Sequence, residues 1–102
     1  MAKLLVMYNR PADPSAFDTY YTSTHTPLAK KLPGLRSFTV SDGQINTPEG
    51  QAPHHRIAEL TFDSMADLRA AVSSPEGEAA VADFANFASA GVTVMMYDTR
   101  DA

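Results

Sequence analysis

The chain has 102 residues, of which 44% are hydrophobic and 20% are charged, and its formal net charge is −4. This length allows one small domain with a single core, and the composition is that of a globular protein rather than a disordered one. The negative charge argues against nucleic acid as a partner, because binding to phosphates requires a basic face.

The chain contains no cysteine, which excludes disulfides, thiolate zinc sites and cysteine nucleophiles. This fits a reducing compartment. The apolar run near the N-terminus is too short for a signal peptide, and no stretch approaches the length of a transmembrane helix. We therefore expect a cytoplasmic protein that has no membrane partner.

The first predicted element is a strand over residues 3–8, an apolar run that stops at Asn9-Arg10-Pro11. Asp13 followed by Pro14 then predicts the start of a helix, since aspartate is a good N-cap and proline fits the first helical position.

The helix that follows carries one stripe of core-type side chains at steps of three and four. The stripe comprises Phe17, Tyr21, Thr24, Leu28 and Leu32. Pro27 interrupts it, because proline lacks an amide proton and disfavours helical geometry at the residue before it. We expect the helix to end or kink near Thr24 and His25, and a second short helical turn to run from Pro27 through Leu32.

The remaining elements follow from alternation, caps and breakers. A second strand is predicted over residues 35–41 and a third over residues 55–62, joined by a Gly- and Pro-rich loop (residues 42–53) that is placed to act as a lid. Ser64 with Asp67 starts a second helix, Ser74-Pro75 restarts it and it runs to about residue 85. A last strand spans residues 92–97. This β-α-β-β-α-β order predicts a single α+β domain over residues 1–102, ferredoxin-like, with a four-stranded antiparallel sheet and both helices on one face.

The first and last strands are apolar at nearly every position, so both of their faces require cover. Two helices cover only one face of a sheet. A second copy of the same sheet is the simplest cover for the other face and predicts a homodimer. A central place in the sheet is the alternative, because it also reduces the exposed apolar area.

The segment "YYTSTHTPL" places a histidine one turn after a tyrosine on the same helix face, since positions four apart are neighbours. Phe17, Tyr21 and His25 thus form a row. A histidine at a helix end beside a cleft suits proton transfer near neutral pH, and the tyrosine suits its orientation or the binding of a substrate oxygen. The alternative is a histidine that only satisfies loose carbonyl groups, beside aromatic residues that only fill the core.

Other candidate groups are weaker. His54 and His55 are adjacent and therefore point to opposite faces of a strand, which favours loop-edge histidines over a metal site. Glu59 is expected to form an ion pair with Lys3 or with Arg56 of a neighbouring chain, and the alternative is a second acid/base group. The glycines are scattered and form no phosphate-binding loop, so we predict neither a metal nor another cofactor.

The end of the second helix, "ADFANFASAG", carries two aromatic residues and an asparagine. Phe84 and Phe87 are predicted to line the core or the wall of a cleft. Asn86 suits a cap and is a candidate contact for a ligand.

Nearly the whole chain resembles the EthD family of dimeric α+β barrel proteins. The resemblance lies in "LLVMYNRPADPSAFDTYYTSTHTPLAKKLPGL" and in "HRIAELTFDSMADLRAAVSSPEGEAAVADFANFASAGV". It implies a homodimer whose two sheets face each other, a ligand cleft between each sheet and its helices, and a role for His25 at the end of the first helix. Proteins similar in fold include muconolactone isomerases, methylmuconolactone methylisomerases, polyketide cyclases and monooxygenases.

Three functional hypotheses follow. The first is a cofactor-independent isomerase or cyclase that acts on a hydrophobic, carbonyl-bearing catabolic intermediate, with His25 and Tyr21 as catalytic residues. Its apolar ligand wall comprises Phe17, Phe84 and Phe87, with Asn86 beside it. The second is a non-catalytic protein that binds a ligand in an oxidative pathway such as ethyl tert-butyl ether degradation. The third is a cofactor-free monooxygenase.

Overall fold

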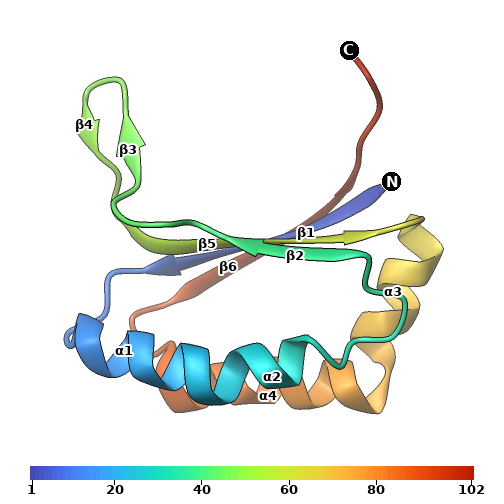
Figure 1. The fold of residues 1–102 in the computed structure, drawn as a ribbon, viewed down its shortest axis with the longest axis horizontal. Coiled ribbons are helices and arrows are strands. Elements are labelled where there is room, and N and C mark those ends of the chain that lie inside the picture. The colour runs from blue at the N-terminus through green and yellow to red at the C-terminus, as the bar shows by residue number, and fades with distance from the viewer.

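The computed structural model describes residues 1–102. Its elements are β1 (Ala2–Asn9), α1 (Pro14–Tyr20), a π-helical turn η1 (Tyr21–His25), α2 (Thr26–Ala29), β2 (Ser37–Val40), β3 (Asn46–Thr47), β4 (Gly50–Gln51), β5 (His54–Phe62), α3 (Met65–Ser73), α4 (Pro75–Phe87) and β6 (Val92–Asp98). Four strands form an antiparallel sheet in the order β2-β5-β1-β6, and the helices lie on one side of it (Figure 1). The predicted ferredoxin-like α+β fold is confirmed. None of the helices has the length and hydropathy needed to cross a bilayer.

Side-chain caps fix where three helices begin. The Asp13 carboxylate accepts a hydrogen bond from the Ala16 amide, and Ser64 Oγ accepts one from the Asp67 amide. Ser74 Oγ accepts from the Gly77 amide and separates α3 from α4. Each cap satisfies an amide that has no partner within its own helix. The three predicted helix starts are confirmed.

The predicted break near Thr24 and His25 takes the form of a π-helical turn, η1, and not of a helix end, and the short α2 follows it at Pro27. Thr26 keeps helical dihedral angles (φ −57°, ψ −46°), and its amide donates to the carbonyl of Tyr21, five residues back. This wider turn shifts the register of the backbone hydrogen bonds, so the helix passes the proline and continues to Ala29. His25 therefore lies inside a continuous helical segment and not at a C-terminus that would favour its protonated form.

The loop predicted over residues 42–53 contains structure of its own. Strands β3 and β4 pair there as a short hairpin, which projects from the side of the sheet opposite the helices (Figure 1). The preceding strand, β2, is shorter than predicted and pairs with β5 over four residues.

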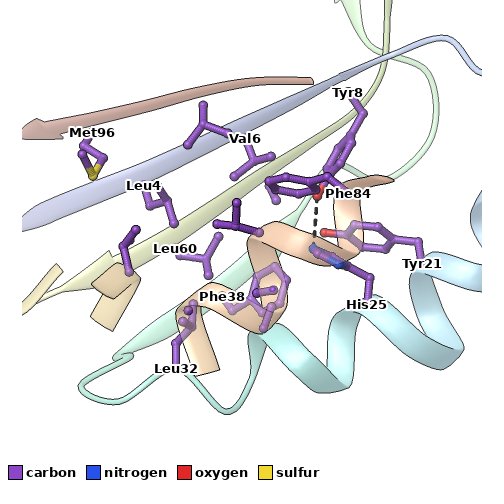
Figure 2. Close-up of a pocket in the computed structure, with 17 residues that line it drawn as sticks. Leu4, Val6, Tyr8, Tyr21, His25, Leu32, Phe38, Leu60, Phe84 and Met96 are labelled. Carbon is purple, nitrogen blue, oxygen red and sulfur yellow. Dashed lines mark hydrogen bonds between the residues drawn. The ribbon is translucent and has the colours of Figure 1, made fainter. Parts of the chain in front are cut away.

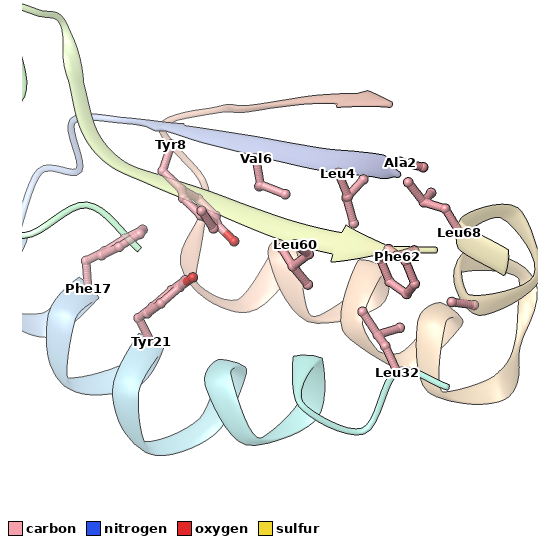
Figure 3. Close-up of a cluster of buried hydrophobic side chains, with 12 residues drawn as sticks. Ala2, Leu4, Val6, Tyr8, Phe17, Tyr21, Leu32, Leu60, Phe62 and Leu68 are labelled. Atoms are coloured by element: carbon pink, nitrogen blue, oxygen red, sulfur yellow. The ribbon is translucent and has the colours of Figure 1, made fainter. Parts of the chain in front are cut away.

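The core lies between the sheet and the helices and includes alternate residues of β1 and β5 (Figure 3). Leu4, Val6 and Tyr8 are buried on β1, and Leu60 packs with them from β5. Helices α3 and α4 meet closely at Gly77, where an added Cβ would clash with the carbonyl groups of α3. Only glycine fits there without displacing one helix from the other.

Strand β6 lies at an edge of the sheet, where β1 is its one neighbouring strand. Val94, Met95, Met96 and Tyr97 are 48%, 42%, 40% and 40% exposed. The other strand that is apolar on both faces, β1, lies between β5 and β6. A central position thus reduces the apolar exposure of β1 but not that of β6.

Candidate functional site

A cavity of about 140 Å³ lies between the inner face of the sheet and the helices. Seventeen residues line it, and 15 of them are hydrophobic. All four strands of the sheet contribute side chains, and the helical wall comes from η1, α2, α3 and α4 (Figure 2). The cavity therefore suits an apolar ligand body.

Polar atoms gather at one end of this cavity. Tyr8 reaches it from β1, and Tyr21 and His25 reach it from η1 (Figure 2). The Tyr8 hydroxyl lies 3.4 Å from His25 Nε2. The Tyr21 hydroxyl is buried and has no hydrogen-bond partner. It lies beside the Tyr8 hydroxyl without a well-formed hydrogen bond, so it can donate to a ligand atom instead.

The other ring nitrogen of His25 faces a carboxylate on α4. His25 Nδ1 lies 2.9 Å from Asp83 Oδ2, and the two side chains are 5% and 6% exposed. Asp83 Oδ1 accepts two further hydrogen bonds, from the Tyr20 hydroxyl (2.6 Å) and from Asn86 Nδ2 (3.0 Å). The carboxylate can only accept, so it fixes the tautomer with the proton on Nδ1 and leaves Nε2 as a base.

Burial sets the protonation states at the polar end. Desolvation lowers the pKa of His25, although the Asp83 carboxylate opposes that shift. Desolvation also raises the pKa of Asp83, but hydrogen bonds from Tyr20, Asn86 and His25 outweigh it, so the net pKa is lowered. Burial raises the pKa of Tyr8 and raises that of Tyr21 to about 12. Near neutral pH the site thus holds a neutral imidazole, a carboxylate and two phenols that can donate.

The aromatic residues at the end of α4 enclose the imidazole. The ring centroids of Phe84 and Phe87 lie 5.3 Å and 4.7 Å from that of His25. These rings shield the histidine from water, which strengthens its interaction with the carboxylate.

Comparison with known proteins places the chain in a family. The family model of the EthD domain matches residues 9–91. The chain belongs to the EthD family. It is 42% identical over 99 residues to an uncharacterised 11.0 kDa protein in the thcB-thcC intergenic region of Rhodococcus erythropolis. The alignment covers 96% of this chain and 94% of that protein.

Solved structures agree with this assignment. The crystal structure of an EthD family protein from Bacillus halodurans C-125 is 34% identical, with a TM-score of 0.89 and coverage of 98% of this chain and 99% of that one. A dimeric protein of unknown function and ferredoxin-like fold from Bacteroides fragilis is 17% identical, with a TM-score of 0.64 and coverage of 96% and 95%. The latter likeness shows the fold alone.

The residues predicted as site residues of this EthD protein fall into two groups. His25, Tyr21 and Phe84 line the cavity. Phe17, Asn86 and Phe87 line a separate shallow hollow on the surface. Two of this second group still touch the polar end, because Phe87 packs on the His25 ring and Asn86 donates to Asp83.

Sequence reasoning missed Tyr8 and Asp83 as site residues. Each interrupts an apolar stripe and was detectable for that reason. Tyr8 follows Leu4 and Val6 on the buried face of β1, and it brings a hydroxyl into that face. Asp83 shares the buried face of α4 with Ala80, so it places a carboxylate among core positions.

The other histidines and Glu59 lie apart from the cavity. His55 Nε2 is 2.8 Å from Asp18 Oδ1, and no three metal-ligating side chains come together in the structure. Glu59 pairs with Lys3 at 3.1 Å, which is one of the two ion pairs that the sequence suggested.

Proposed function

We propose that this EthD protein is an enzyme that moves a proton next to a carbonyl group in a hydrophobic substrate about the size of one ring. One observation carries the proposal: an otherwise apolar cavity has a base and two phenols at one end, and one phenol has no partner. A cavity of about 150 Å³ is known to hold benzene, so about 140 Å³ admits one six-membered ring.

The proposed reaction is an isomerisation with no net oxidation. His25 Nε2 removes a proton from the carbon beside the carbonyl, and the electrons of that C–H bond move onto the carbonyl oxygen. The Tyr21 hydroxyl donates to this oxyanion, while Asp83 stabilises the imidazolium through Nδ1. His25 then returns the proton to a conjugated carbon, the double bond shifts and the base is regenerated. The step needs no redox cofactor, because it only relocates one proton.

The test is turnover in D₂O of a β,γ-unsaturated γ-lactone, whose saturated carbon beside the carbonyl carries the proton to be removed. We expect the double bond to shift and deuterium to enter the ring, both followed by NMR. His25→Ala should lower the rate by about 10² to 10⁴ through loss of the base, and Tyr21→Phe by about 10² to 10³ through loss of the oxyanion donor.

Three other results of this assay would contradict the proposal. Lactone binding without isomerisation or deuterium uptake by the parent would favour the ligand-binding role in an oxidative pathway. Oxygen consumption coupled to substrate loss would favour a monooxygenase. Full activity in both variants would place the chemistry elsewhere in the protein.

The face of the sheet away from the helices is the second part of the proposal: it binds the same face of another copy. Leu5 pairs in register with Met95 and Met7 pairs with Ile57, so these side chains share that face. Half-buried and exposed apolar groups of this kind mark an interface. The ferredoxin-like neighbour from Bacteroides fragilis is dimeric, which supports a dimer here.

Light scattering after size exclusion tests the dimer. The parent is expected to have the mass of two chains, and Met95→Lys to have the mass of one, because a lysine on the shared face introduces unpaired charges at the interface. Val81→Lys is the matched control: Val81 is also exposed but lies on α4, so it should leave the dimer intact. A monomeric parent would contradict this part of the proposal and leave the cavity chemistry untouched.

A further inference from the structure

A second hollow shares two residues with the wall of the cavity and differs from it in charge. This groove lies between the first helical segment and β2, and it is lined by Tyr21, Thr22, Thr26, Lys30, Phe38, Val40 and Arg56. Tyr21 and Phe38 line the cavity as well. The cavity and the groove therefore adjoin at these two residues.

The groove carries positive charge and no acidic lining residue. Arg56 and Lys30 supply the cations, and Thr22 and Thr26 add hydroxyl groups one helical turn apart. The chain as a whole has a net charge of −4, so a groove lined by two cationic side chains and no acidic one is opposite in sign to the protein as a whole. A cationic groove with hydroxyl donors is suited to an anionic group.

Arg56 links the groove to the reacting end of the cavity. Its guanidinium carbon lies 4.5 Å from the centroid of the Tyr21 ring, and its side chain is only 18% exposed. One nitrogen, Nη2, donates to Asp18 Oδ1 at 3.0 Å, and no other hydrogen bond occupies the guanidinium. A half-buried arginine with free N–H groups suits a planar carboxylate, which accepts two of them at once.

The charge balance favours an anion with a single charge. Asp18 offsets one of the two cations, so the three groups together supply one net positive charge. A carboxylate matches that balance, whereas a phosphate dianion would exceed it.

We infer that the substrate is an amphipathic carboxylic acid: its ring lies in the cavity, its carbonyl oxygen meets Tyr21 and His25, and its carboxylate binds Arg56 and Lys30 in the groove. The inference rests on the proposed function and adds the chemical class of the substrate to it. Tyr21 and Phe38 line both hollows, so such a ligand contacts both side chains.

The test compares a keto acid with its neutral isostere. The probes are 3-benzoylpropionate, which has one ring, one ketone and one carboxylate, and its primary amide, with the His25 ring signals followed by NMR to confirm binding in the cavity. We expect the acid to bind the parent about tenfold more tightly than the amide, since a charged hydrogen bond outweighs a neutral one. Added salt should weaken binding of the acid only.

Two substitutions of equal charge locate the effect. Lys30→Gln should reduce the preference for the acid several-fold, whereas Lys31→Gln should leave it unchanged, because Lys31 does not line the groove. Arg56→Gln should remove most of the preference. Lys30 is exposed, so its variant remains informative even if Arg56→Gln fails to fold.

The outcomes separate this inference from the proposed function. Equal binding of acid and amide, with shifts of the His25 signals, would overturn the carboxylate subsite and leave the cavity proposal standing. Equal loss of preference in Lys30→Gln and Lys31→Gln would also overturn it. The preference for the acid would then come from the net charge of the whole protein and not from contacts in the groove. Failure of both probes to shift the His25 signals would overturn the subsite together with the cavity on which it depends.

Discussion

Two histidine–carboxylate pairs in this protein have nearly the same bond length and very different surroundings. His25 and Asp83 are 2.9 Å apart with side chains 5% and 6% exposed, whereas His55 and Asp18 are 2.8 Å apart with side chains 20% and 46% exposed. The distance alone does not separate a structural pair from a reactive one. Burial does, because charges interact more strongly away from water.

The second nitrogen of each ring adds to this contrast. His25 Nε2 lies at an apolar cavity beside two phenols. The Asp18 carboxylate also accepts from Arg56, so His55 belongs to a surface ion cluster. The comparison indicates that a buried carboxylate directs one ring nitrogen so that the other is free to act as a base.

The largest expected effect comes from removing the charge of each carboxylate in turn. Asp83→Asn should lower the rate of lactone isomerisation about 10- to 100-fold, because the imidazolium loses its counter-charge and a single amide oxygen replaces the two carboxylate oxygens that face Tyr20, Asn86 and His25. Asp18→Asn is the comparison and should change the rate at saturating lactone less than about twofold, because Asp18 contacts His55 and Arg56 and not the reacting end of the cavity, so a change in the groove alters the affinity for the lactone instead. Initial rates at saturating lactone measure both.

Similar rate losses in the two asparagine variants would break the proposed distinction between the pairs. A loss in Asp83→Asn that follows its loss of folded protein would assign Asp83 a structural role only. Circular dichroism spectra at the assay temperature separate that case from a change in the chemistry.

Neighbouring tyrosines are expected to respond in opposite directions to loss of the hydroxyl. Tyr21→Phe removes a buried hydroxyl without a partner, so the free energy of unfolding should rise by about 1 kcal/mol. Tyr20→Phe removes the 2.6 Å hydrogen bond to Asp83, so the free energy of unfolding should fall. Urea denaturation at one protein concentration measures both, and a destabilised Tyr21→Phe would mean that the hydroxyl has a partner within the protein.

The fold was largely predictable because the sequence patterns that indicate it, helix caps and alternation along strands, involve residues close together in the chain. The cap residues Asp13, Ser64 and Ser74 fixed the helix starts, and alternation along residues 55–62 fixed the inner face of a strand. The hairpin at residues 46–51 was missed, because its strands have two residues each and carry no periodicity.

The site was only partly predictable because it joins distant segments. His25 and Tyr21 share one helix, so their spacing brought them together. Asp83 is 58 residues from His25, and no local pattern pairs the two. Pro27 indicated a break in the helix near His25, but not that this break is a π-turn between Tyr21 and His25 that keeps the segment helical past the proline. That turn placed His25 in a buried segment where its pKa falls.

The smallest expected effect is a pH dependence of stability that belongs to one pair. Because the pKa of His25 is lowered in the folded state, the unfolded chain binds a proton more readily at this residue. The free energy of unfolding contributed by His25 should therefore fall as the pH drops below about 6.5, the ordinary histidine value, and level off below the folded-state pKa. His25→Gln should flatten the dependence between about pH 7.5 and pH 5.5 relative to the parent, whereas His55→Gln should retain the His25 contribution. Urea denaturation at fixed protein concentration measures this slope. An unchanged slope in His25→Gln would mean that protonation of the imidazole is not coupled to unfolding. Burial would then no longer be the feature that distinguishes the two histidine–carboxylate pairs.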